Sequence, residues 1–596
     1  MIREALNAGL NTEALDLARQ AMVDSPQSAE LHYLGALASA RMGAISEAER
    51  WLEQVDREHL GDNPIAGEVW GLAGRIAKER YSAANDKTHA AARDYARIAI
   101  DSYQRAFRIS GSAYPIINAA TMALLSGDPA RARTLARQAL SALGTTADHW
   151  SHASAGEAQL LLEELDDARI HYQEAYRLAG SRFGAIASMR RQLLLIGSIP
   201  ARNLLDAVPA PHVIAFSGHM IDRPERASPR FPARLEARVT LALREKLATF
   251  GPSIGYAQAA CGADILFLEA MQDSGMQTHV VLPFAKTDFI KASVSFGGET
   301  WDARFERVLD RATRVVFATE EAFLGDDVLF EHAANLIQGM AFLRAKELST
   351  HPLLLTLCEP GSSALAGGTA ATTRIWTRKG GQAENIDLAA LRGGDSVERR
   401  NDDEDPAVDR SEQSATPRAL KSLLFADVSG FSRMPEQYTP QFAEMFLGTC
   451  KRILDALEHR AIDANTRGDG LFLVFDLPSH AAEFAVRLQS ALSTFDWPAL
   501  GLAGATGVRI GLHTGPVFRT WDPVMSKTTF YGTHVNRTAR LEPIVQPGHI
   551  FVTEGFAASL VADDDARFSC HYIGVMPLAK HFGDARLYRL RWANDD

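Results

Sequence analysis

Apolar residues recur with the 3.6-residue period of an α-helix throughout the first third of the chain. This part is rich in Ala and Leu, and short turns near residues 42, 126 and 164 separate apolar helices from amphipathic ones. Small residues at the expected helix crossings would let paired helices approach closely. The pattern predicts an all-α helical repeat domain over residues 1–205.

This helical pattern resembles tetratricopeptide repeats, with about three or four helix pairs at irregular spacing. The resemblance implies a concave surface that binds a protein partner. The alternative is a helical cap that only supports the neighbouring domain or a dimer.

Between residues 206 and 392 the pattern changes to short apolar runs separated by helical stretches. These runs lie at 212–216, 262–269, 279–284, 314–318 and 353–357. Continuous apolar runs are typical of strands that are buried on both faces of a parallel sheet. We therefore expect an α/β domain with a doubly wound parallel sheet.

Ligands of doubly wound sheets bind at the carboxyl ends of the strands. Ser217, Gly218 and His219 follow the first run directly and are the candidate ligand residues. With the later turn at 367–369, they make the segment resemble the Rossmann-like nucleotide-sensing domains related to the LOG-type phosphoribohydrolases. The resemblance implies a small nucleotide-like ligand, and the lack of a complete Gly-rich phosphate loop favours sensing over catalysis. The alternative for His219 is a structural role at the turn.

Residues 393–418 contain few apolar side chains and many charged ones. Such a segment buries too little apolar surface to fold, so we expect a disordered linker. A flexible linker would let two copies of the following domain meet.

Composition limits the partners and the location. With 62 Lys and Arg against 73 Asp and Glu, the net charge is -11, which argues against a general nucleic-acid binder. The chain has no apolar run of about 18 to 20 residues and no signal-peptide core at its start. Its four scattered cysteines are typical of buried thiols in a reducing compartment. We expect a cytoplasmic protein that does not enter a membrane.

The last segment, residues 419–596, begins with an apolar run that leads into Asp427 and a Gly turn. A second carboxylate, Asp469, lies in an Arg-Gly-Asp-Gly turn before the strand-like residues 471–475. A strand beside a hairpin would place the two carboxylates together. Such a pair suits Mg²⁺ or Mn²⁺, because hard cations prefer oxygen ligands. Taken alone, Asp469 would be explained by ordinary turn chemistry.

Further motifs follow in order at 508–515, 531–541 and 547–553. With them the segment resembles the class III nucleotide cyclase catalytic domain, the family of adenylate and guanylate cyclases. The resemblance implies an α+β, ferredoxin-like fold. It also implies that Asp427 and Asp469 bind two Mg²⁺ or Mn²⁺ ions in each active site.

The same resemblance gives roles to three further residues. Arg509 would contact the terminal phosphates, Asn536 would position the ribose, and Arg540 would stabilise charge on the α-phosphate. These roles suit the reaction, an attack of the ribose 3′-hydroxyl on the α-phosphorus that expels pyrophosphate. Asn536 and Arg540 are four residues apart and would share one face of a helix. The alternative for that pair is a solvated helix surface.

Two departures from the family leave the base open. Asn465 and Thr529 stand where adenylate cyclases carry Lys and Asp and guanylate cyclases carry Glu and Cys. Both side chains can hydrogen-bond to either purine. We favour ATP because many bacterial members that resemble this chain carry a small polar residue at the position of Thr529. Lys580 is the candidate for the family's late phosphate-binding Lys, although strict spacing places Phe582 there.

In this family each active site lies between two cyclase domains. The chain carries both halves, so the resemblance implies a homodimer with two composite sites. The expected function is a soluble class III cyclase acting on a nucleoside triphosphate. One alternative is an inactive cyclase-like module that binds nucleotide within a signalling scaffold. Another is hydrolysis of a nucleotide by the α/β segment, which would require a carboxylate such as Glu331 near the bound sugar.

Overall fold

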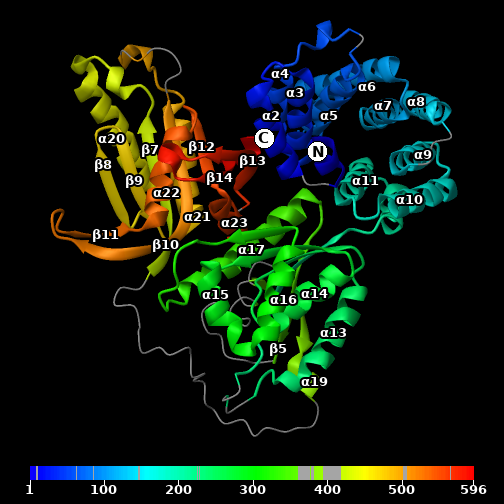
Figure 1. Ribbon diagram of the computed structural model, residues 1–596. Helices are drawn as coiled ribbons and strands as arrows, with labels where there is room; N and C mark the ends of the chain where they lie inside the picture. The colour runs from blue at the N-terminus through cyan, green and yellow to red at the C-terminus, as the bar shows by residue number, and fades with distance from the viewer. Residues whose placement is uncertain are drawn as a thin grey trace.

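The structure is a computed structural model, and it describes residues 1–8, 11–61, 63–84, 86–144, 148–223, 226, 229–359, 373, 376–377, 381–392, 418–500, 502, 507–563 and 566–595. It has three parts: a row of helices, a parallel sheet with helices, and a mixed sheet with helices (Figure 1). The expected linker, apart from Arg418, and the turn at 367–369 lie outside the described residues. Arg418 does not belong to a linker, because it is the first residue of a strand and is buried. Its charge is paired with that of Asp326 (2.5 Å).

The first part is helical, as the periodicity predicted. Three of the connections fall at the predicted turns, between α3 and α4, α7 and α8, and α9 and α10. The helices are α1 (Ile2–Ala8), α2 (Asn11–Asp24), α3 (Ala29–Arg41), α4 (Ile45–Glu53), α5 (Ala66–Ala83), α6 (Ala90–Ser110), α7 (Ala113–Leu125), α8 (Pro129–Ala142), α9 (His149–Leu161), α10 (Leu165–Ala179), α11 (Phe183–Ile196) and α12 (Ile199–Asn203).

Glycines facing aromatic rings set the close approach within these helix pairs. A Cβ built on Gly74 of α5 would lie 2.9 Å from the ring of Tyr103 on α6. Gly156 of α9 stands in the same relation to Tyr172 of α10, also at 2.9 Å. Both tyrosines are buried. The prediction that small residues occupy the crossings is therefore confirmed at these two pairs.

One turn of the repeat departs from its equivalents. In the turns before α4, α8 and α10, the residue two positions before the helix has a left-handed backbone. In the first two turns this residue is a glycine, Gly43 (φ 81°) and Gly127 (φ 87°). In the third it is Glu163, with φ 69°. Its side chain is largely exposed and pairs with Arg133 (3.0 Å), which stabilises little at the surface. A side chain at this position is therefore strained.

We expect Glu163→Gly to raise the free energy of unfolding by about 0.5 to 1 kcal/mol, since relief of the left-handed strain exceeds the added entropy of the unfolded chain. Thermal and denaturant unfolding of the full chain would measure it. The matched control is Glu164→Gly, because Glu164 has an ordinary φ of -90°. Equal effects of the two substitutions would contradict the explanation.

The second part is a six-stranded parallel sheet in the order β4-β3-β2-β1-β5-β6. Alternate residues of β1 face opposite sides, with Val213 and Ala215 packing toward α17, and Ile214 and Phe216 packing toward α13 and α14. The elements are β1 (His212–Gly218), α13 (Glu236–Ala248), β2 (Ser253–Ala257), α14 (Ala263–Asp273), β3 (Gln277–Leu282), α15 (Lys286–Ser293), α16 (Glu299–Asp310), β4 (Arg314–Phe317), α17 (Val328–Glu347), β5 (Pro352–Cys358), β6 (Gln382–Asp387) and α19 (Leu388–Arg392).

One predicted strand of this sheet is wrong. Residues 262–269 belong largely to α14, and the strand that precedes it is β2 at Ser253–Ala257. Residues 263–268 of the helix are all buried, so no polar face interrupts the apolar run. Periodicity alone does not distinguish a short apolar strand from a helix that is buried all round.

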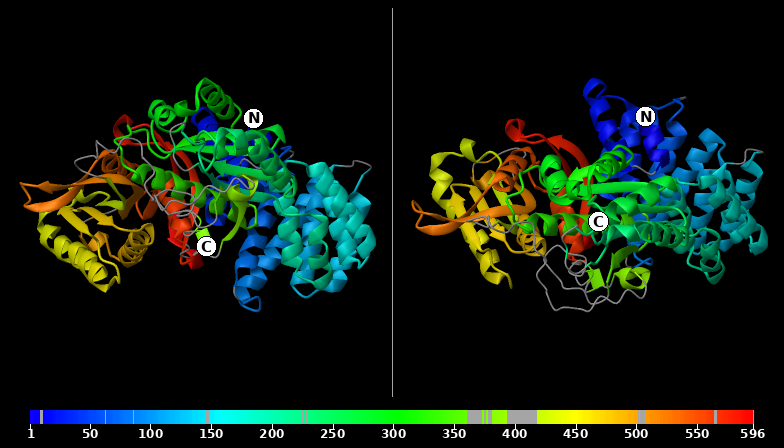
Figure 2. Two further views of the ribbon diagram at one scale, coloured as in Figure 1. Left: turned by 90° about the horizontal axis from the view of Figure 1, so that it is seen from below. Right: turned by 60° about the horizontal axis from the view of Figure 1, so that its bottom comes forward.

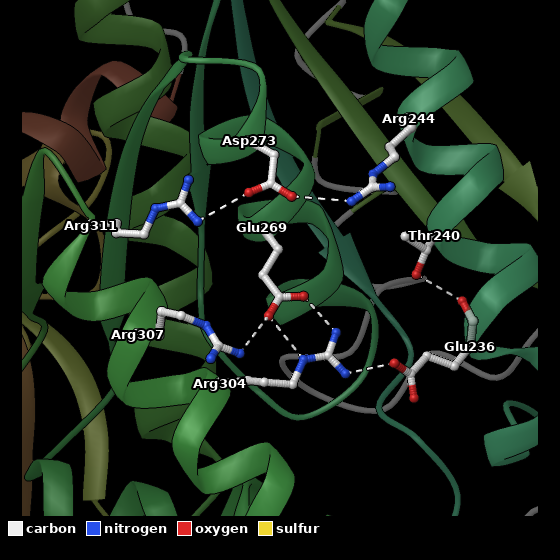
Figure 3. A network of polar contacts seen from close by, with 8 residues as sticks. All are labelled: Glu236, Thr240, Arg244, Glu269, Asp273, Arg304, Arg307 and Arg311. Atoms are coloured by element: carbon white, nitrogen blue, oxygen red, sulfur yellow. Dashed lines mark hydrogen bonds and ion pairs between the residues drawn. The ribbon is translucent and has the colours of Figure 1, made fainter.

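Ion pairs join the three helices on the outer side of the sheet (Figure 3). Arg304 of α16 forms an ion pair with Glu269 of α14 (2.5 Å) and another with Glu236 of α13 (2.7 Å). Asp273 of α14 accepts from Arg244 of α13 and from Arg311, which directly follows α16, both at 3.1 Å. Because the Arg304 side chain is only 11% exposed, this fork ties the three helices together more firmly than a solvated pair would.

The third part is a mixed sheet in the order β13-β14-β12-β10-β7-β9-β8, with β11 paired to β10. Helices α20 and α21 cover one face, and α22 lies on the other. The elements are β7 (Arg418–Val428), α20 (Thr439–Ala456), β8 (Asp463–Arg467), β9 (Gly470–Phe475), α21 (Pro478–Leu492), β10 (Val508–Asp522), β11 (Lys527–Tyr531), α22 (Thr533–Leu541), β12 (His549–Thr553), α23 (Glu554–Ala562), β13 (Phe568–Pro577) and β14 (Asp584–Trp592).

Helix α17 lies where the second and third parts meet, and it packs against α23 (Figure 1). The crossing is so close that a Cβ on Gly339 would lie 2.1 Å from the carbonyl oxygen of Ala558. An ion pair between Arg314 and Glu554 (2.7 Å) adds to this contact. The two parts are therefore packed together through backbone-level contact.

The two ends of the chain also meet, and Figure 2 shows the first helices near the last strands. The carboxylate of Asp16 on α2 accepts hydrogen bonds from the Tyr572 hydroxyl (2.5 Å) and the Val575 N–H (2.8 Å) of β13. Among the helices that the structure describes, none is both long enough and apolar enough to cross a membrane.

Candidate active site

Asp427 and Asp469 lie side by side at one end of the mixed sheet. Asp427 is the penultimate residue of β7, and Asp469 lies in the turn between β8 and β9, where Gly468 has φ 65°. The strand pairing of β7 with β9 brings the turn to Asp427. Burial, and next the carboxylate of Asp427, raise the pKa of Asp469 to about 6. The pair is thus a site where negative charge is crowded.

Arg509 faces this pair from the neighbouring strand. It is the cross-strand partner of Asp427 in β10, and its guanidinium donates to that carboxylate (2.5 Å). The same nitrogen lies 3.0 Å from an oxygen of Glu542. In this state Arg509 therefore pairs with two acidic groups of its own chain.

Glu542 is a functional candidate that the sequence analysis missed. It follows α22 directly, and burial raises the pKa of its carboxyl group to about 7, with Arg509 acting in the opposite direction. A signal was present, since a carboxylate two residues after Arg540 ends an amphipathic helix. Only the packing of this helix end against β10 reveals that it meets Arg509.

Asn536 and Arg540 lie on α22, with Asn536 exposed and Arg540 half-buried. The opposite side of the helix is fixed: His534 lies 2.7 Å from a ring nitrogen of His513 and 3.3 Å from the Thr319 hydroxyl of the parallel-sheet part. Among the described residues, no hydrogen bond or ion pair connects Asn536 or Arg540 to the aspartates. Within the described part of one chain, the two halves of the predicted site are therefore not joined by a hydrogen bond or an ion pair.

Asn465 and Thr529 lie on strands that approach each other, β8 and β11. The hydroxyl of Thr529 donates to the buried carboxylate of Asp463 (2.5 Å), and Lys527 donates to the same group (2.6 Å). Asp463 and Lys527 lie two residues before Asn465 and Thr529, so each pair shares one face of its strand. Sequence reasoning missed them because their link depends on the tertiary contact of the strands.

Lys580 lies in a short 3-10 turn, Ala579–His581, that contacts α22. Its φ of 60° is unusual for a residue other than Gly. Phe582, the alternative by strict spacing, lies under the guanidinium of Arg537, at 6.0 Å from ring centre to carbon. Of the two candidates, Lys580 is the one that carries a positive charge, and Phe582 is packed against Arg537.

The candidate ligand residues of the parallel sheet, Ser217, Gly218 and His219, lie at the end of β1 and just after it. The turn is packed tightly, since a Cβ on Gly218 would lie 2.4 Å from the Cβ of Ala263. Beside it, the missed Asp264 is buried and accepts from the Ala260 N–H (3.3 Å). Burial raises the pKa of Asp264 to about 7. Binding of a nucleotide-like ligand here stays a prediction.

The aspartate pair fits a hard divalent cation. Two crowded carboxylates supply oxygen ligands, and a cation would relieve the repulsion that raises the pKa of Asp469. Among the described residues, no group of three or more His, Cys, Asp or Glu side chains is arranged to hold a metal ion. We therefore assign Glu542 as an ion-pair partner of Arg509 and not as a metal ligand. The remaining ligands of the cation would have to come from phosphate and water.

Asp469 should make stability depend on pH in the metal-free protein. Its folded pKa lies above the ordinary value for Asp, so the stability it contributes is present at low pH and is lost as the pH rises through about 6. We expect Asp469→Asn to raise Tm, relative to the unsubstituted chain, more at pH 7.5 than at pH 5 in the presence of a chelator.

Melting curves across that pH range would test this. The control is Asp455→Asn, because the pKa of Asp455 is lowered by Lys451. A Tm difference for Asp469→Asn that does not change with pH would refute the crowding of charge.

Two family models match parts of this chain. Residues 416–589 match the family model described as Adenylate and Guanylate cyclase catalytic domain. Residues 11–123 match the model TPR-S, described as Tetratricopeptide Repeats-Sensor. The two terminal parts of the chain therefore carry a cyclase catalytic domain and a tetratricopeptide-type domain.

The relatives match about a quarter of this chain. An adenylate cyclase of Neurospora crassa is 23% identical over 163 residues, which are 24% of this chain and 7% of that protein. Retinal guanylyl cyclase 2 of Rattus norvegicus is 29% identical over 145 residues, 22% of this chain and 13% of that protein. A Trypanosoma brucei adenylate cyclase solved in its monomeric state covers 29% of this chain and 87% of its own, with 20% identity and a TM-score of 0.26. This chain thus spans only a small share of the two curated relatives.

Proposed function

We propose, on the premise that residues 416–589 are an adenylate and guanylate cyclase catalytic domain, that this chain converts a nucleoside triphosphate into its 3′,5′-cyclic nucleotide and pyrophosphate. ATP is the proposed substrate. The observation that carries the proposal is the pair of adjacent carboxylates, Asp427 and Asp469, with Arg509 paired to the first of them.

Two Mg²⁺ or Mn²⁺ ions at Asp427 and Asp469 would supply activation of the 3′-hydroxyl and charge neutralisation on the triphosphate. The chain's own residues bind and orient the substrate. Arg509, placed beside these carboxylates, would turn toward the terminal phosphates, and Glu542 would keep it close. Its ion pair with Asp427 then acts as the resting arrangement of the site.

Asn536 and Arg540 would act on a substrate held by the aspartates of a second chain. This is supported by the lack of a hydrogen bond or ion pair from these residues to Asp427 among the described residues of one chain, and by their position on the accessible side of α22. Asn536 would fix the ribose, and Arg540 would stabilise the charge that develops on the α-phosphate. The proposed enzyme is therefore a homodimer with two shared sites.

The base would lie near Asn465 and Thr529. The Thr529 hydroxyl already donates to Asp463, so its oxygen is the group left to accept from the exocyclic amine of adenine. Guanine presents a carbonyl at the equivalent place and would need a donor there. This arrangement supports ATP over GTP.

The test is incubation of the full-length chain with Mg²⁺ or Mn²⁺ and, separately, ATP, GTP, CTP and UTP, with products resolved by mass spectrometry. We expect cyclic AMP as the main product. A different cyclic nucleotide would refute the choice of base and retain the cyclase. If the folded protein bound nucleotide and formed no product from any of the four, a nucleotide-binding scaffold would replace the enzyme.

A further inference from the structure

A cavity of about 360 Å³ opens among the helices of the first part. It is lined by residues of α5, α7, α9, α10 and α11, which form the curved row in Figure 1. Ser349, just after α17, closes one side. The cavity has the size of a small-molecule site.

Three cationic side chains line this cavity: Arg75 and Lys78 of α5 and Arg191 of α11. Lys78 is buried, and the two arginines are half-buried. Burial, and then the charge of Arg75, lower the pKa of Arg191 to about 10. The cations are therefore close enough to repel one another.

These cations have few partners among the described residues. None of them forms an ion pair. Arg191 uses one guanidinium N–H, to the backbone carbonyl of Glu347 (3.0 Å), and Arg75 makes one long contact, to the carbonyl of Ala40 (3.4 Å). A guanidinium carries five donors, so most of them remain available to a ligand.

The cavity also holds two carboxylates, Glu79 and Glu157, and among the described residues neither forms an ion pair with the three cations. Glu79 partly offsets the lowering of the pKa of Lys78 and Arg191. Glu157 is buried and accepts from Thr121 and from the Gln192 amide (2.6 Å). The same Gln192 separates it from Lys78, whose ammonium donates to the amide oxygens of Gln192 (2.9 Å) and Asn118 (2.7 Å). Burial raises the pKa of Glu157, and its hydrogen bonds and the charge of Lys78 act in the opposite direction. Partly buried cations without an ion-pair partner cost free energy that an anion would recover.

Aromatic side chains form part of the same wall. Trp150 of α9 and Tyr114 of α7 line the cavity beside the cations. Flat apolar surfaces next to fixed positive charge suit a ligand with an aromatic or apolar part and an anionic group.

We propose that this cavity binds a small organic anion with at least two negative charges, as phosphate or carboxylate groups, held by Arg75, Lys78 and Arg191 against Trp150. Its occupant would be a metabolite-sized molecule rather than a protein. The proposal does not depend on the cyclase reaction.

The position of the cavity connects it to the rest of the molecule. Arg191 donates to Glu347, the last residue of α17, and Ser349 of the wall has a left-handed φ of 54°. At its other end α17 carries His332, which packs edge-on against His534 of α22. An anion that draws Arg191 toward the cavity would act directly on the end of α17.

The test is isothermal titration calorimetry of the full-length chain without metal or nucleotide. Phenyl phosphate and phthalate are the probes, since they pair a flat ring with a phosphate and with two carboxylates, and benzyl alcohol is the uncharged comparison. Arg75→Gln and Arg191→Gln remove cations from the wall. Arg97→Gln is the matched control, because Arg97 is 65% exposed on α6.

We expect at least one anion to bind, benzyl alcohol not to bind, and each wall substitution to weaken binding by about 10-fold or more, with the control within about 2-fold. Whichever anion binds more tightly identifies the charged group. Should Arg191→Gln fail to melt cooperatively, Arg75→Gln decides, because Arg75 makes only one long contact. Absence of binding at about 10 mM, or equal affinity in the folded wall variants, would overturn the proposal.

Discussion

Replacing Asp427 by Asn is expected to lower cyclic nucleotide formation by about 100- to 1,000-fold or more, the scale on which loss of one catalytic electrostatic group acts. An amide at this position carries no charge for a metal ion and no longer pairs with Arg509. The protein should still fold, because Arg509 keeps its contact with Glu542 (3.0 Å). Product formation by mass spectrometry and Tm would be measured on the same preparation.

The matched control for this loss is Asp476→Asn. Asp476 lies on the same domain, is 56% exposed, and pairs with Lys421 at the surface. Its substitution should leave the rate within about 2-fold. Activity of Asp427→Asn above a tenth of the unsubstituted rate would contradict the assignment of Asp427 as a metal ligand.

Mixing two inactive chains is expected to restore activity. Asp427→Asn and Arg540→Ala should each be inactive alone as homodimers, because every site then lacks either an aspartate or the arginine. In a heterodimer one site carries both lesions and the other carries neither. With equal mixing and random pairing, about a quarter of the unsubstituted activity should return.

The mixture has its own control. Asp427→Asn mixed with Asp469→Asn should stay inactive, because both lesions fall on the same half of the site and no intact site can form. Co-expression of the chains with two different affinity tags would ensure that heterodimers exist. No recovery from purified heterodimers would exclude shared sites and leave catalysis to a single chain.

The parts of the site that sequence could predict are those encoded by local chemistry. A strand ending in Asp427 and a Gly-flanked turn carrying Asp469 are visible as pattern and turn residues, and the structure brings them together through β7 and β9. Glu542, Asp463 and Lys527 could not be found in that way. Each has meaning only through a partner on another strand or helix, and nothing in their spacing specifies that partner.

The fold shows the same division. Helical periodicity located the turns of the repeat, because each helix there has a polar side. It failed at 262–269, where residues 263–268 of α14 are all buried and the apolar run looks like a strand. Hydrophobic periodicity is visible only where a helix alternates between buried and exposed side chains. A helical run in which every residue is buried shows no such alternation.

The close crossing at Gly339 has a practical consequence for anyone who works with fragments. A piece that starts at Arg418 would lose Asp326 and Arg314, the ion-pair partners of Arg418 and Glu554, and would expose the face of α23 that α17 covers. Such a piece would expose apolar surface and unpaired charge that are buried in the full chain. We therefore expect it to be less soluble and to self-associate more readily than the full chain. Kinetic constants measured on such a piece would be affected by the artificially exposed surface. A segment that begins at residue 206 retains these contacts together with the whole parallel sheet.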